Sequence, residues 1–446
     1  MMSNVRRARL FGLSGYHWIV LVAAWLGWGF DVFDALLFNF VAPNAVPTLL
    51  HIPLGTPEAR QATVFWTGVL TSILLIGWAA GGLAFGWFAD RYGRKRALFL
   101  TIALYACGTA LCAVATDLWQ LVLFRVLASL GIGGEWAIGA SLVAETVPDE
   151  RRVEAATLVY TSSPLGIILA STVNYHIAGV WLADTPATSW RYVFLCGLAP
   201  VCVAFFARIF VRESEVWEKE VRHARPPRLA ELFTTETRAR TISGMVAAVT
   251  ALLTWWACNA FVPLLGATLA SEYAAGSGIT GEAARLLSEA WKSQASNGFN
   301  LGGLLGALAA IPLARVMGRR TMFVTYFAYS AVLLFVTFGL DFAPATRLRL
   351  LFAVGMGVYG VFSTFVFYLP ELFPPRLRAT GSGLCYNIGR VVAALGPTVV
   401  GLISAAAGGS SDIIVRTLFW VGVFPLITAL TARLLIIETR GQSLPT

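Results

Sequence analysis

Long apolar segments follow one another along nearly the whole chain, and short polar stretches separate them. A helix needs about 20 residues, at a rise of about 1.5 Å each, to cross the roughly 30 Å of hydrocarbon in a bilayer. The chain is therefore predicted to be an all-α membrane protein with both termini on one side. The pattern predicts twelve spanning helices, at residues 17–40, 63–89, 97–116, 118–145, 153–180, 191–211, 241–269, 294–314, 321–340, 347–369, 380–406 and 413–436.

One polar interval, residues 212–240, is longer and more charged than the others. We interpret it as a linker between two six-helix halves. This interpretation gives an N-terminal half at residues 1–211 and a C-terminal half at residues 241–446.

The two halves also repeat each other in sequence. Gly93–Lys95 recurs 225 positions later as Gly318–Arg320, and Glu145 recurs 226 positions later as Glu371. Nearly equal offsets at separate places indicate a duplicated unit. We therefore expect two pseudo-symmetric six-helix bundles.

Composition agrees with a membrane protein, because 57% of the residues are hydrophobic and only 13% are charged, against about 25% charged residues in soluble domains. The net charge of +9 lies in short clusters between the apolar segments. Such clusters mark cytoplasmic loops, so we predict a plasma (inner) membrane protein with both termini cytoplasmic, and no nucleic-acid binding. The six cysteines lack metal or disulfide spacing and are interpreted as small buried hydrophobes.

The polar turn between the second and third predicted spans has a distinctive order of residues, namely Gly86, Asp90, Arg91, Gly93 and Arg94. This order resembles the signature loop of the major facilitator superfamily of secondary transporters. The resemblance implies two helix bundles around a central cavity that opens to each side of the membrane in turn. The two glycines are expected to allow close backbone approach and unusual dihedral angles.

Other charged residues at predicted cytoplasmic ends belong to the same resemblance. It implies that Glu145, Arg152, Glu371 and Arg378 act with the signature loop as a cytoplasmic gate. In the second copy of the repeat Arg315 stands where the first has Asp90, so the two loops are not expected to function symmetrically.

Four charged residues of the N-terminal half lie well away from the ends of their predicted spans: Asp31, Asp34, Arg125 and Glu135. Because ionisable groups inside a bilayer cost several kcal/mol, those that remain are functional candidates. Asp31 and Arg125 are predicted at similar depth and can meet, and the two aspartates share a helix face, so they can bind one cation or share one proton. We interpret the four as proton-coupling residues. The alternatives are a permanent ion pair and, for Glu135, a hydrogen bond in a glycine-rich helix seam.

Family resemblances extend to these helices. Asp31-Val32-Phe33-Asp34 resembles the first-helix signature of aromatic-acid, sialate and related organic-acid proton symporters, with Val32 in place of the usual glycine. Gly133-Gly134-Glu135 resembles the fourth helix of metabolite and sialate proton symporters.

Arg390, inside the eleventh span, resembles the arginine of organic-anion transporters and is predicted to bind substrate. A guanidinium can make two hydrogen bonds to a carboxylate and stays charged, so it suits an anion site. The alternative is an arginine bound to helix carbonyls or to Glu371. The neutral residues predicted to complete the substrate site are Asn387, Tyr386, Tyr160, Asn174, Asn259 and Tyr359.

The sequence shows no nucleotide-binding loop, metal-ligand cluster or nucleophile with a base. We therefore predict no enzyme and no cofactor, but a monomeric secondary transporter driven by a gradient. It is expected to import a small organic anion, such as a monocarboxylate, an aromatic acid or a sialic-acid-like compound, in symport with protons. The alternatives are a sugar porter or efflux antiporter of the same fold, and a sensor that does not transport.

Overall fold

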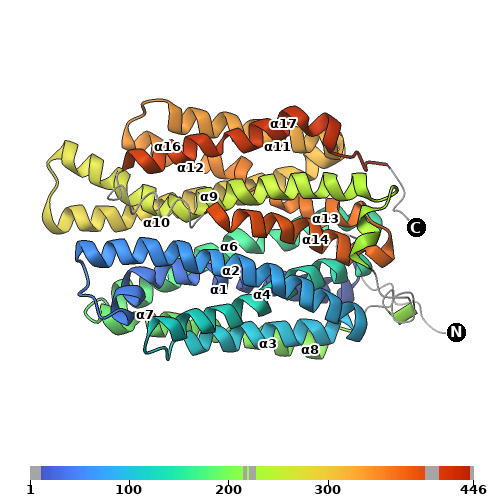
Figure 1. The fold of residues 1–446 in the computed structure, drawn as a ribbon, viewed down its shortest axis with the longest axis horizontal. Coiled ribbons are helices and arrows are strands. Elements are labelled where there is room, and N and C mark those ends of the chain that lie inside the picture. Colours follow the sequence, from blue (N-terminus) through green and yellow to red (C-terminus); the bar gives the residue numbers. More distant parts are fainter. Residues whose placement is uncertain (1–11, 214–217, 220–227, 397–410, 442–446) are drawn as a thin grey trace.

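The computed structural model describes residues 12–213, 218–219, 228–396 and 411–441. Within these ranges every regular element is a helix and no β-strand is present. Figure 1 shows the helices running along one common axis as an elongated bundle. The all-α prediction is confirmed.

The first half of the chain carries eleven of the described helical elements. They are α1 (Gly15–Leu49), α2 (Pro57–Tyr92), α3 (Arg94–Cys112), α4 (Leu118–Thr146), η1 (Asp149–Arg151), α5 (Arg152–Tyr160), α6 (Ser162–Asn174), η2 (Tyr175–Trp181), α7 (Pro186–Leu195), η3 (Cys196–Leu198) and α8 (Pro200–Phe210).

The second half follows the same plan with fewer interruptions. Its described elements are η5 (Leu229–Phe233), α9 (Arg238–Ser277), α10 (Gly281–Val316), α11 (Gly318–Gly339), α12 (Pro344–Val358), α13 (Phe362–Glu371), α14 (Pro375–Ala393), α16 (Ser411–Val421) and α17 (Val423–Leu435).

The two halves form two layers (Figure 1), with α1 to α8 in one layer and α9 to α17 in the other. Between the layers, α2 packs against α14, α5 packs against α10 and α13, and α6 packs against α10. We call one end of the bundle the basic end; it carries the turns at Gly93 and Gly318 and residues 436–441 (Figure 1, right).

Ten helical stretches among the described residues are long and apolar enough to span a membrane. The other two predicted spans, 191–211 and 380–406, correspond to α7, η3 and α8 and to α14. Residues 397–410 of the second lie outside the described part. Twelve helical spans therefore fit the structure, although α1 and α9, with 35 and 40 residues, extend well beyond the predicted boundaries.

Several predicted spans are not continuous helices. The fifth is interrupted at Thr161 and the twelfth at Gly422, and in each case a proline follows three residues later, Pro164 and Pro425. Proline has no N–H to donate to the carbonyl four residues before it, so the turn that precedes it loosens. Hydropathy alone does not register such interruptions.

Polar residues at the turns opposite the basic end fix where helices begin. Asp117 precedes α4 and accepts hydrogen bonds from the backbone N–H groups of Trp119 and Gln120, at 2.8 and 3.0 Å. Thr56 does the same for α2, with Pro57 at the first helical position. These caps satisfy N–H groups that otherwise have no partner in a helix.

Glycines bring related helix pairs into backbone contact in both halves. A Cβ atom at Gly81 of α2 would lie 2.0 Å from the carbonyl oxygen of Leu130 in α4. A Cβ atom at Gly306 of α10 would lie 2.0 Å from the carbonyl oxygen of Met356 in α12. The two glycines are 225 positions apart, so the internal repeat extends to helix packing.

Candidate functional site

A cavity of about 30 Å³ lies between the two halves, and we call it the central cavity. Eight of its fourteen lining residues are aromatic: Trp28, Trp78, Tyr160, Trp255, Trp256, Tyr359, Phe362 and Tyr386. Arg390 lines it as well. A cavity of this size has room for about two water molecules and not for an organic acid. The halves are therefore closed around it.

Arg390 of α14 is fully buried between two aromatic rings at the central cavity. Its guanidinium carbon lies 4.3 Å from the ring centre of Trp78 and 4.7 Å from that of Tyr386. Its Nη1 donates a hydrogen bond to Oδ1 of Asn387 at 2.8 Å. Because Trp78 belongs to α2, the side chain bridges the two halves. Glu371, one of the alternative partners expected for Arg390, instead accepts hydrogen bonds from Arg319.

Asp31 of α1 is completely buried beside Arg390 and Glu135. Neither of its carboxylate oxygens receives a hydrogen bond from an N–H or O–H donor in the described part of the chain. The carboxyl of Glu135, on α4, lies within hydrogen-bonding reach. Two carboxyl groups can form that bond only when one of them carries a proton. A hydrogen bond between Asp31 and Glu135 would therefore require a proton on one of the two.

Asp34 and Arg125 occupy a separate polar cluster, nearer the end of the bundle opposite the basic end. Asp34 accepts a hydrogen bond from Oγ1 of Thr109 at 2.5 Å. Arg125 donates to the backbone carbonyls of Asp34 and Ala35, at 3.2 and 2.8 Å. The expected meeting of Arg125 with Asp31 is therefore not observed. Asp31 has Glu135 rather than Asp34 as its carboxyl partner, and Arg125 holds the backbone of α1.

Of the neutral residues predicted for the substrate site, the three tyrosines Tyr160, Tyr359 and Tyr386 line the central cavity. The hydroxyl of Tyr359 shares a hydrogen bond of 2.7 Å with Ser163, across the two halves. Asn387 contacts the site through Arg390.

Asn259 and Asn174 do not line the central cavity. Asn259 is buried within α9, and Asn174 is the last residue of α6. That these two asparagines bind substrate stays a prediction.

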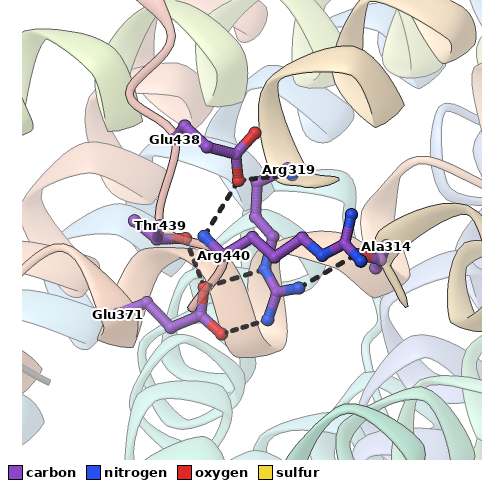
Figure 2. Close-up of polar contacts among 6 residues, drawn as sticks. All are labelled: Ala314, Arg319, Glu371, Glu438, Thr439 and Arg440. Carbon is purple, nitrogen blue, oxygen red and sulfur yellow. Dashed lines mark hydrogen bonds and ion pairs between the residues drawn. The ribbon is translucent and has the colours of Figure 1, made fainter. Parts of the chain in front are cut away.

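The basic end carries two copies of one polar arrangement. Glu213 accepts hydrogen bonds from the backbone N–H groups of Arg94 and Lys95, the first residues of α3. In the second half Glu438 accepts a hydrogen bond from the N–H group of Arg319 at 2.8 Å (Figure 2). It also accepts one from the N–H group of Arg320 at 3.0 Å. A carboxylate at a helix N-terminus is favoured by the helix dipole.

Each copy also pairs an arginine with a glutamate of the neighbouring turn. Arg319 binds Glu371 through two hydrogen bonds, of 2.7 and 3.1 Å, and Thr439 donates to the same carboxylate (Figure 2). Arg94 lies 3.5 Å from Glu145 in the first half. The repeat read from the sequence therefore corresponds to a repeated set of contacts.

The profile of the Major Facilitator Superfamily matches residues 18–397. The chain belongs to the Major Facilitator Superfamily. It is 30% identical to a probable 4-methylmuconolactone transporter of Cupriavidus pinatubonensis, over 94% of this chain and 90% of that protein. It is 27% identical to the sialic acid transporter NanX of Escherichia coli, over 90% of each chain.

Among solved structures, the proton:xylose symporter XylE superposes with a TM-score of 0.72 and 17% identity, covering 96% of this chain and 98% of that one. At that identity the likeness shows the fold alone. The chain is thus a multi-pass membrane transporter of the Major Facilitator Superfamily and not an enzyme.

The signature loop of this superfamily transporter agrees with the sequence prediction in part. Gly93 has φ of 105°, a conformation that disfavours residues with a side chain. Gly86, by contrast, lies within α2 with no atom within 4 Å of a Cβ built on it, so the expected close approach is absent there. Arg91 stacks on the rings of Trp87 and Tyr92, at 5.4 and 5.5 Å.

The remaining gate residues predicted for the superfamily transporter are only partly described. The side chains of Asp90 and Arg152 lie outside the described residues, and Arg378 is half-buried. Arg315, which replaces the acidic residue in the second copy, forms an ion pair with Glu154 of α5 across the two halves.

Sequence reasoning missed two groups of residues in this transporter. The first is the set of tryptophans at the central cavity; the signal was their position in the middle of spans, whereas tryptophan favours the membrane surface. For the second group, Glu213 and Glu438, it missed the capping role. Their separation of 225 positions equals the repeat offset, which is the signal that both make the same contact.

Proposed function

We propose that this superfamily transporter imports a small organic anion together with protons by alternating access. The observation that carries the proposal is Arg390, whose permanent charge is buried at the cavity between the halves. A guanidinium in a dry site favours an anionic ligand, because it offers paired hydrogen bonds and full charge. The halves that move are the predicted units 1–211 and 241–446, joined by the linker 212–240, in a single chain acting as a monomer.

Within the organic anions, the aromatic wall favours a planar, unsaturated acid over a sialic-acid-like compound or a sugar. Aromatic faces stack on planar ligands, whereas a polyhydroxylated ligand needs a hydrogen-bond partner for each hydroxyl. The indole N–H groups of Trp78 and Trp255 are buried without an acceptor among the described residues, so they can donate to the ligand. The relatives named for 4-methylmuconolactone and for sialic acid support a metabolite substrate.

The proton-coupling residues are proposed to be Asp31 and Glu135, with Asp34 and Arg125 positioning α1. A protonated carboxyl pair is compatible with burial, whereas two adjacent carboxylates are not. Symport follows if the pair takes up a proton on one side and releases it on the other.

The basic end is proposed to face the cytoplasm of a cell whose plasma (inner) membrane holds the protein, with both termini on that side. The clusters of Lys and Arg support this orientation. A cysteine introduced at the exposed Arg96 should be shielded from an impermeant reagent outside the cell, and one at Glu282 should react with it.

Uptake into proteoliposomes tests the proposal. Vesicles with an alkaline interior should accumulate 2,5-dihydroxybenzoate or cis,cis-muconate against a concentration gradient, and N-acetylneuraminate and xylose poorly. Collapse of the pH gradient by a protonophore should abolish accumulation. Accumulation that follows xylose and ignores the acids would contradict the anion proposal, and accumulation insensitive to the protonophore would contradict proton coupling.

A further inference from the structure

Two buried carboxyl groups connect the central cavity with a second cavity, and we infer that they relay protons between the two. Asp31 lies beside Arg390, which lines the central cavity, and Glu135 lines the second cavity. Protons thereby reach the basic end by a route separate from that of the transported anion. The inference rests on the proposed function, because it assigns a path to the protons of the symport.

The second cavity, here called the inner cavity, has a volume of about 20 Å³ and lies toward the basic end. Glu135 lines it together with Gly139 and Leu142, which follow on α4. Trp28 and Tyr160 line both cavities, so their side chains form the wall between them. The inner cavity has room for about one water molecule, which can accept a proton from a carboxyl group.

The carboxyl pair passes beside this aromatic wall. Asp31 lies close enough to Arg390, a residue of the central cavity, for the two charges to interact. Its carboxyl is within hydrogen-bonding reach of Glu135, which lines the inner cavity. Oε2 of Glu135 and both oxygens of Asp31 receive no hydrogen bond from donors in the described ranges. These oxygens are thus available to exchange a proton.

The other titratable and charged groups that face the pair come from three helices. Asp34 lies one turn further along α1 and is bound by Thr109, and Arg390 of α14 is bound by Asn387. Tyr105 of α3 lies close enough to act on both carboxyls, and its buried hydroxyl has no partner among the described residues.

A glycine on α1 allows the acid on α4 to reach this position. A Cβ atom at Gly27 would lie 1.8 Å from Oε1 of Glu135, so any side chain there displaces the carboxyl. Gly27 is therefore a positioning residue for the relay. Gly15, on the same helix, has no atom within 4 Å of the equivalent Cβ atom and offers a matched control.

The relay step moves one proton and leaves the pair as it began. At rest Asp31 and Glu135 hold one proton between them. When the central cavity opens outward, Asp31 takes a second proton from the external water and the anion binds at Arg390. After closure Glu135 gives one proton to water in the inner cavity, and the proton on Asp31 is shared again.

The experiment compares wild type with Glu135→Gln, Glu135→Asp, Gly27→Ala and Gly15→Ala in proteoliposomes that contain a pH-sensitive dye. With 2,5-dihydroxybenzoate as the probe, three readouts are taken: accumulation driven by a pH gradient, acidification of the interior, and exchange of internal for external probe at equal pH. Infrared spectroscopy of the purified proteins, without probe, records the C=O absorption of protonated carboxyl groups.

We expect Glu135→Gln to lose accumulation and acidification while exchange continues, because exchange needs no net proton movement. Gly27→Ala should show the same loss although the acid is intact, Glu135→Asp should recover part of the coupling, and Gly15→Ala should behave as wild type. The infrared band should disappear in Glu135→Gln. It should shift in Gly27→Ala and stay unchanged in Gly15→Ala.

Coupled accumulation by folded Glu135→Gln at the wild-type level would overturn the relay. So would an infrared band that is unchanged in both Glu135→Gln and Gly27→Ala. If Glu135→Gln does not fold, Glu135→Asp and Gly27→Ala decide, since both keep the acid and move its carboxyl. Wild type that moves the probe without protons contradicts the symport itself, which separates failure of the proposed function from failure of the relay.

Discussion

At the scale of single residues, Arg390 decides between classes of substrate. Removing its guanidinium in Arg390→Ala should weaken binding of 2,5-dihydroxybenzoate about tenfold to over a hundredfold, because hydrogen bonds to charged groups contribute roughly 1.5–3 kcal/mol. Arg390→Lys keeps the charge but loses the geometry of paired hydrogen bonds, so its affinity should lie between those of wild type and Arg390→Ala. Calorimetric titration of the purified proteins measures these affinities.

The amide of the same compound provides the control ligand. It should bind wild type poorly and respond little to Arg390→Ala, because the group that distinguishes acid from amide has gone. Arg347, which donates to the backbone carbonyls of Thr337 and Leu340, provides the control variant, and Arg347→Ala should leave both affinities unchanged. An equal loss for acid and amide in folded Arg390→Ala would point to a structural arginine.

Residue identities at the site were more predictable than their contacts. Asp31, Glu135 and Arg390 are recognisable because a charge in an apolar segment is costly and conspicuous. Which of them meet depends on how each helix is rotated about its axis, and depth along the membrane normal does not determine that. This is why Arg125 was expected beside Asp31 and is found on the backbone of α1.

At the scale of helices, the capping carboxylate of α11 should stabilise the protein in a pH-dependent way. Burial raises the pKa of Glu438. The backbone N–H groups of Arg319, Arg440 and Arg320, together with the charge of Arg319, lower it by more, so the pKa lies below its ordinary value near 4.5. A lowered folded-state pKa stabilises the fold above the ordinary pKa, and this contribution disappears as the pH falls through the folded-state value.

Glu438→Gln should therefore lower the melting temperature at neutral pH, consistent with the roughly 0.5–2 kcal/mol that a helix cap contributes. The difference from wild type should vanish once the pH is below the folded-state pKa of Glu438. Glu272 is exposed and lies near the C-terminal end of α9. Glu272→Gln should therefore have the same melting temperature as wild type at either pH. A destabilisation of Glu438→Gln that is equal at neutral and acid pH would exclude the charge as its cause.

Helix packing in the first half should depend on Gly81 and not on Gly86. In Gly81→Ala the new methyl group meets the backbone of Leu130, which cannot move aside, so overpacking should cost about 1–3 kcal/mol. Gly86→Ala adds the same methyl group on the same helix into open space and should melt as wild type does. Thermal unfolding followed by tryptophan fluorescence compares the two, and equal melting temperatures would mean that α2 and α4 can separate without cost.

At the scale of the whole molecule, hydropathy was sufficient to predict the fold class, and the repeat predicts a division of the chain into two halves. Ten of the described stretches are apolar over a length that can cross a bilayer, so the signal is strong in those ten. The interruptions at Thr161 and Gly422 and the closed state of the central cavity were not predictable. They arise from contacts between segments and from the relative position of the two halves.

The ion pair between Arg315 and Glu154 joins the two halves at the basic end and should favour the state closed on that side. Both side chains are partly exposed, and such pairs contribute about 0.2–1 kcal/mol. Arg315→Glu places like charges opposite each other and should raise the fraction open at the basic end by up to about fivefold. Distances between spin labels on the two halves measure that fraction, in detergent and in lipid.

The exchange of both charges, in Arg315→Glu with Glu154→Arg, should restore the wild-type distribution, because the attraction is the same with the signs reversed. A double variant as open as Arg315→Glu would mean that Arg315 acts through contacts other than this pair.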